Sequence, residues 1–128
     1  MAWYIAHVIM SVRFKDGYQD KYPVWENFIL VEAASKKEAL GKAEQRGRED
    51  EGDSQGSFTW DGRPATWTFA GIRKLIICEG RGVQPTSGIE VSYSEYELPT
   101  EEALQRLVNG DSVHLIYVEE PSPDDTEQ

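Results

Sequence analysis

Apolar and polar residues alternate along the first segment of the chain, residues 3–14. This spacing predicts a strand with one apolar face, because successive side chains of a strand point to opposite faces of the sheet. Residues 24–33 carry large apolar side chains at both odd and even positions, which is typical of a strand covered on both faces. We therefore predict two antiparallel strands joined by a polar loop that begins at residues 15–17.

The apolar spacing becomes helical after residue 34. Ser35 and Glu38 fit a capping box, in which the two side chains satisfy free backbone N–H groups at the start of a helix. Small residues then recur on one side of the helix, at Ala39, Ala43 and Gly47. We expect a helix that lies close to the sheet and ends near Gly47.

A hairpin and a long strand follow the helix. Asp61-Gly62 predicts a tight turn between residues 58–60 and the strand at residues 65–78, because both turn residues tolerate positive φ. Gly71 interrupts the long strand and predicts a β-bulge.

Three further elements complete the predicted fold. Residues 89–93 alternate again and predict a half-exposed strand with Ile89, Val91 and Tyr93 on its apolar face. Thr100 can cap a helix that ends at Gly110, and residues 113–118 predict a last strand.

These elements follow the order β-β-α-β-β-β-α-β, which defines an α+β fold. We expect a mostly antiparallel sheet of about five or six strands with two helices packed on it. Residues 1–118 are assigned to a single domain. Residues 119–128 contain five acidic residues and no basic one, so we expect an acidic, disordered tail.

The net charge of −10 is unevenly distributed along the 128 residues. Residues 1–48 hold eight basic and six acidic residues, whereas residues 49–128 hold five basic and seventeen acidic ones. A negative surface repels nucleic-acid phosphates and anionic lipids, so we expect neither nucleic acid nor membrane as a partner. The same charge would steer a basic protein toward this chain, although it could also serve solubility alone.

A single cysteine, Cys78, permits no disulfide within the chain. Residues 1–7 lack the basic and apolar regions of a signal peptide, and no apolar run reaches the length of a membrane span. We therefore expect a cytoplasmic protein.

No catalytic, metal or cofactor motif is visible in the sequence. A nucleophile needs an oriented base beside it, and the two histidines, His7 and His114, both lie in predicted strands. Two separated histidines and one cysteine do not make a zinc site. We assign no catalytic residue, no metal ligand and no cofactor.

Four stretches of the chain share their order and spacing with a known family. They are Trp3-Tyr4-x-Ala6, Trp25-Glu26 with Val31-Glu32-Ala33-Ala34-Ser35-x-x-Glu38-Ala39-x-x-Lys42-Ala43, Trp60-x-Gly62-x-x-x-x-Trp67-x-Phe69-x-Gly71, and Gly88-Ile89-Glu90-Val91-Ser92-Tyr93. Over residues 3–95 the chain resembles the bacterial family catalogued as domain of unknown function 4288. The resemblance implies a compact single-domain bacterial protein without an assigned activity, and it provides no catalytic residues.

The family pattern includes Trp25, Glu26, Trp67 and Glu90. Glu26 also stands out on physical grounds, because a carboxylate in an apolar strand must be paired, solvated or protonated. It could pair with Arg13 or Arg73, or it could bind a ligand beside Trp25. The candidate binding residues are therefore Trp25, Glu26, His7, Trp67 and Glu90.

Three functions remain open from the sequence. The first is a non-enzymatic protein-interaction or binding module, with a protein partner or a second copy of the chain. The second is a small-molecule-binding protein or minor enzyme that uses Glu26, His7 and nearby aromatic residues in a pocket on the sheet. The third is an acidic immunity or antitoxin-like protein. The first is favoured because charge is the strongest signal and no catalytic constellation is visible.

Overall fold

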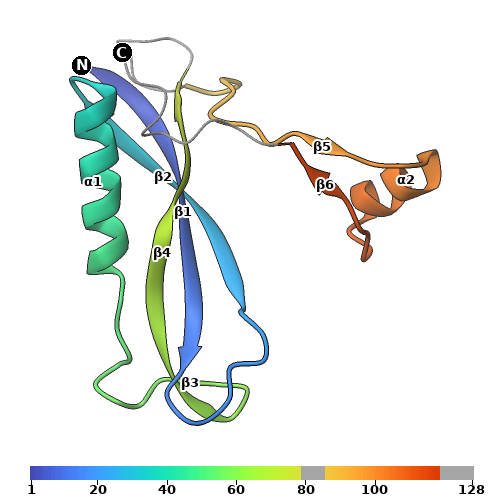
Figure 1. The fold of residues 1–128 in the computed structure, drawn as a ribbon. Coiled ribbons are helices and arrows are strands. Elements are labelled where there is room, and N and C mark those ends of the chain that lie inside the picture. Colours follow the sequence, from blue (N-terminus) through green and yellow to red (C-terminus); the bar gives the residue numbers. More distant parts are fainter. Residues whose placement is uncertain (79–85, 119–128) are drawn as a thin grey trace.

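The computed structural model describes residues 1–78 and 86–118, which form a body and a projecting arm (Figure 1). The body is a four-stranded antiparallel sheet, in the order β2-β1-β4-β3, with α1 on one face. Its elements are β1 (Ala2–Phe14), β2 (Val24–Ala33), α1 (Lys36–Glu49), β3 (Thr59–Trp60) and β4 (Arg63–Ile77). The arm, residues 95–118, contains β5 (Tyr96–Glu97), α2 (Glu101–Asn109) and β6 (Ile116–Tyr117). β5 and β6 pair antiparallel in a sheet of their own.

Strand β1 lies at the centre of the body, between β2 and β4. Its even-numbered side chains point toward α1, on what we call the inner face of the sheet, and its odd-numbered side chains point to the outer face. The core on the inner face comprises Tyr4, Ala6, Val8, Met10, Val31, Ala33, Ala39, Ala43 and Leu75. The alternation predicted for residues 3–14 is therefore confirmed.

Helix α1 begins with the predicted cap. The Ser35 hydroxyl accepts a hydrogen bond from the Glu38 N–H at 3.1 Å, and the Glu38 carboxylate accepts one from the Ala34 N–H at 2.7 Å. The helix runs to Glu49, past the end predicted at Gly47. Gly47 lies inside the helix, where the absence of a side chain allows its backbone to pack directly against the Phe69 ring of β4.

Strand β4 is irregular near its middle. Its register with β1 shifts on both sides of the pair formed by Ile9 and Gly71, and Gly71 has a φ of 152°. The bulge predicted at Gly71 is therefore present. Beyond it, Lys74 lies directly opposite His7 on β1. The hairpin turn is also confirmed, with positive φ at Asp61 and Gly62.

The predicted α+β class and the order β-β-α-β-β-β-α-β are confirmed, and the six strands are divided between a four-stranded and a two-stranded sheet. The second helix, α2, lies in the arm beside β5 and β6 and away from the four-stranded sheet (Figure 1). Residues 113–118 pair only at 116–117. The predicted tail, residues 119–128, lies outside the described residues.

The predicted strand at residues 89–93 is unpaired, and from residue 91 onward its exposed and covered faces are the reverse of those predicted. Val91 and Tyr93 are exposed, whereas the hydroxyl of Ser92 contacts His7 on the sheet and that of Ser94 contacts Tyr117 of β6. The reason is chemical: the outer face of the sheet presents polar side chains at this point, and these need polar partners.

Two glycines of α1 provide a test of its packing. An alanine at Gly41 would meet nothing, whereas an alanine at Gly47 would place its methyl group against the Phe69 ring. We expect Gly41→Ala to raise the free energy of unfolding by about 0.5–1 kcal/mol through helix propensity. Gly47→Ala should lower it by about 1–2 kcal/mol, because overpacking outweighs propensity. Urea unfolding measures both, and equal stabilisation by the two variants would contradict the close approach of α1.

Candidate functional site

His7 lies at the middle of β1 on the outer face and is 0% exposed. Its neighbours across the sheet are Phe28 on β2 and Lys74 on β4. The Phe28 ring covers the imidazole, with 4.2 Å between the ring centroids. Glu26 lies two residues from Phe28 on the same face of β2, which makes it the diagonal neighbour of His7. Strand register alone therefore brings the acid and the base together.

The two ring nitrogens of His7 each have a partner. Nδ1 lies 2.7 Å from Glu26 Oε2, and Nε2 lies 2.5 Å from the Ser92 hydroxyl. An ionised carboxylate can only accept, so we assign the proton to Nδ1, which donates to Glu26. Nε2 then accepts a hydrogen bond from Ser92. We call this arrangement the Glu26–His7–Ser92 chain.

The second oxygen of Glu26 is held by the arm. The Tyr117 hydroxyl donates to Glu26 Oε1 at 3.2 Å, and the Ser94 hydroxyl lies 3.0 Å from the Tyr117 hydroxyl. The Arg73 guanidinium lies over the Tyr117 ring, 3.6 Å from its centroid, and Arg73 Nε is 4.0 Å from Glu26 Oε2. That Nε is buried and has no hydrogen-bond partner within the described residues.

Burial is the main influence on the His7 side chain and lowers its pKa below the usual value of 6.5. The hydrogen bond and negative charge of Glu26 raise the pKa, and the charges of Lys74 and Arg73 lower it further. The balance favours the neutral imidazole at pH 7. Lys74 is itself only 2% exposed, and its ammonium group donates to the Tyr93 carbonyl at 2.6 Å.

The structure divides the residues that the sequence singled out. His7 and Glu26 are hydrogen-bonded on the outer face. Trp25 lies next to Glu26 in β2 and therefore points to the opposite face, where its ring lies 4.8 Å from that of Trp67. Glu90 is exposed on the segment that leads to Ser92. A binding role for these residues stays a prediction, but Trp25 does not adjoin the carboxylate.

Three residues of this cluster were missed by sequence reasoning: Ser92, Ser94 and Tyr117. The two serines were visible as the polar half of the alternation at residues 89–94, and we assigned them to solvent. A buried histidine and a half-buried carboxylate on adjacent strands require polar partners. That requirement was the available signal.

The Glu26–His7–Ser92 chain has two chemical consequences. It places a hydroxyl against a neutral imidazole that a carboxylate orients, which is the arrangement that activates nucleophiles. It also ties both ends of the arm to the sheet, through Ser92 before β5 and through Tyr117 in β6.

The described residues contain neither a metal-binding cluster nor a membrane-spanning helix. Among residues 1–78 and 86–118, no group of three or more His, Cys, Asp or Glu side chains could hold a metal ion. Neither helix of this part is both long enough and apolar enough to cross a membrane.

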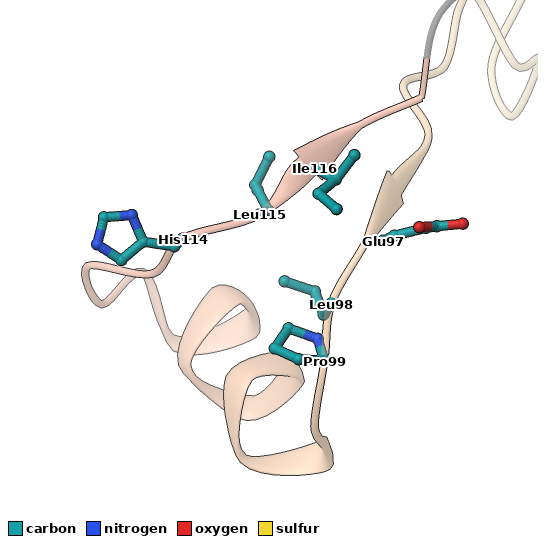
Figure 2. A pocket seen from close by; sticks show the side chains of 6 residues that line it. All are labelled: Glu97, Leu98, Pro99, His114, Leu115 and Ile116. Carbon is teal, nitrogen blue, oxygen red and sulfur yellow. The ribbon is translucent and has the colours of Figure 1, made fainter.

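The arm has an apolar surface of its own. A hollow of about 300 Å³ lies between its two strands and is lined by Glu97, Leu98, Pro99, His114, Leu115 and Ile116 (Figure 2). On α2 only Ala103 is buried, whereas Leu104 and Val108 are 45% and 71% exposed.

Body and arm differ in their relation to known proteins. The body is a compact α+β domain, and the profile of the family described as domain of unknown function (DUF4288) matches residues 3–91. The chain belongs to this family. The match includes His7 and Glu26, ends immediately before Ser92 and leaves out the arm. No curated protein and no solved structure matches the chain.

The lowered pKa of His7 predicts a pH-dependent stability. Folded His7 binds a proton less readily than unfolded His7, so the unfolded state takes up more protons as the pH falls below 6.5. The contribution of neutral His7 to the free energy of unfolding is complete above pH 6.5. It is lost as the pH falls from 6.5 through the lower pKa that His7 has in the folded state. One such group changes the free energy of unfolding by at most about 1.4 kcal/mol per pH unit.

Urea unfolding between about pH 5 and 6.5 measures this slope. His7→Gln should flatten it, whereas His114→Gln, at an exposed position of the arm, should leave it unchanged. A His7→Gln variant with the wild-type slope would contradict the assigned role of His7.

Proposed function

We propose that this protein is a protein-interaction module of the bacterial cytoplasm, and that its arm binds a basic protein. The observation that carries the proposal is the exposed apolar side of α2, where Leu104 and Val108 contact solvent. A helix normally buries its apolar side against a core, so an uncovered one favours a partner.

The arm is too small to be stable through its own contacts. Its two strands pair over two residues each, and α2 has nine residues. Isolated helices shorter than about 12–15 residues are marginal in water, and so are isolated two-stranded ribbons. The root of the arm is held by the Glu26–His7–Ser92 chain, but its far end gains stability only if something covers α2.

Charge favours a basic partner over a second copy of the chain. Residues 1–78 hold eleven acidic and eleven basic residues, so the body is neutral overall. The arm holds five acidic residues and one basic residue, Arg106. A partner that offers an apolar groove bordered by Lys and Arg would match both properties of α2, whereas two arms would repel each other.

The buried, unpaired thiol of Cys78 supports a reducing compartment such as the cytoplasm. An immunity or antitoxin-like function is a special case of the same proposal, in which the basic partner is a toxin. A small-molecule site is less well supported in the arm, because the hollow there is at the small end of ligand pockets.

One variant of the arm and one of the body test this proposal. Leu104→Ser with Val108→Ser removes the apolar side chains of α2, and Val24→Ser removes an exposed apolar side chain of the body as a matched control. Affinity capture from the native host should recover a protein with wild type and Val24→Ser that is lost with the double variant. The captured partner, once purified, should be a basic protein, and its affinity for the wild-type chain should fall as the salt concentration increases.

Two results would overturn the proposal. One is capture of the same proteins by all three chains. The other is a wild-type chain that is a dimer by light scattering and a double variant that is a monomer. In that case a second copy of the chain, and not a basic protein, would cover α2.

A further inference from the structure

Ser92 and His7 differ in their access to solvent. Ser92 is partly exposed, whereas His7 is fully buried behind it. Part of Ser92 therefore contacts solvent, while bulk water is kept from the imidazole. The Glu26–His7–Ser92 chain joins a hydroxyl, an imidazole and a carboxylate in the order of a nucleophile, its base and the group that orients the base.

We propose that Ser92 is a base-activated nucleophile that attacks esters of carboxylic acids, with His7 as its general base and Glu26 as a positioning residue. This activity is independent of the arm's proposed partner, because the apolar residues of α2 take no part in it.

Glu26 is suited to positioning because both of its oxygens have partners. The Tyr117 hydroxyl lies 3.2 Å from Oε1 and 3.5 Å from Oε2, and Oε2 accepts from His7 Nδ1 at 2.7 Å. This bond fixes the tautomer that presents an unprotonated Nε2 to Ser92. A partner on Nδ1 that could donate would permit the other tautomer and remove the base.

Two cations lie near the reacting group. Lys74 and Arg73 are both close enough to His7 to lower its pKa through their charge. Lys74 also donates to the carbonyl of Tyr93, the residue that follows Ser92. Positive charge held in place at this position would stabilise the negative oxygen that forms when an ester carbonyl is attacked.

The proposed reaction has two halves. Ser92 Oγ forms a bond to the ester carbonyl carbon, and its proton passes to His7 Nε2. The carbon–oxygen bond to the alcohol then breaks, and the alcohol leaves with the proton from Nε2. A water molecule next attacks the acyl-serine and gives a proton to Nε2, and that proton returns to Oγ as the carboxylic acid is released.

A fluorophosphonate probe tests the nucleophile directly, since attack by Oγ forms an oxygen–phosphorus bond and expels fluoride. Intact mass and peptide mapping should place one adduct on Ser92 of the wild-type chain. Ser57→Ala is the matched control, because Ser57 contacts the Ser54 carbonyl in the loop between α1 and β3 and takes no part in the Glu26–His7–Ser92 chain. It should react at the wild-type rate, whereas Ser92→Ala should not react.

Glu26→Gln tests the positioning role. An amide can donate to Nδ1 and so permits the unproductive tautomer, and we expect the labelling rate to fall about 100-fold or more. Circular dichroism confirms that each variant is folded. Ser92→Cys provides a second route, because its thiol should react with iodoacetamide faster than Cys78, whose pKa is raised by burial.

The proposal is overturned if the folded wild-type chain gains no adduct at Ser92 while a serine hydrolase in the same tube is fully labelled. It is also overturned if Glu26→Gln labels at the wild-type rate, or if the thiol introduced by Ser92→Cys reacts no faster than Cys78. In those cases the Glu26–His7–Ser92 chain serves only to fasten the arm.

Discussion

A histidine buried at the centre of an antiparallel sheet constrains everything that lies on the same face. The strand backbone cannot satisfy the ring, because its N–H and C=O groups are already paired along the sheet. His7 therefore needs two side-chain partners, and an unpaired buried polar atom would be destabilising. The neighbouring strand supplies one partner, Glu26. The other must come from outside the sheet, and it is Ser92.

This requirement explains how the body and arm are joined. The segment before β5 contacts the outer face through Ser92, and Tyr117 of β6, which also contacts Ser94, binds Glu26. The family match covers the body, including His7 and Glu26, and stops just before the first arm-side contact. The acid–base pair thus belongs to the family domain, whereas the partners on its far side come from residues beyond the match.

Local signals in the sequence predicted much of the body. Ser35 and Glu38 marked the start of α1, Asp61-Gly62 marked the hairpin turn, and Gly71 marked the bulge. Each depends on contacts close in sequence, which is why each could be predicted. The direction of residues 89–94 could not, since Ser92 faces inward only because His7, 85 residues away, needs a partner. The position of α2 was missed for a related reason: an apolar stripe shows that a helix can be covered but does not identify what covers it.

The roles of Glu26 and Ser92 both require that His7 is neutral at pH 7, with its proton on Nδ1 and an unprotonated Nε2 facing Ser92. Correlation of the ring nitrogens with the ring protons by ¹⁵N NMR reads this state directly, because the two nitrogens have different shifts in each tautomer and in the imidazolium. We predict a protonated Nδ1 and an unprotonated Nε2. An imidazolium at pH 7, or a proton on Nε2 in the neutral ring, would contradict the account, because Ser92 would then have no base.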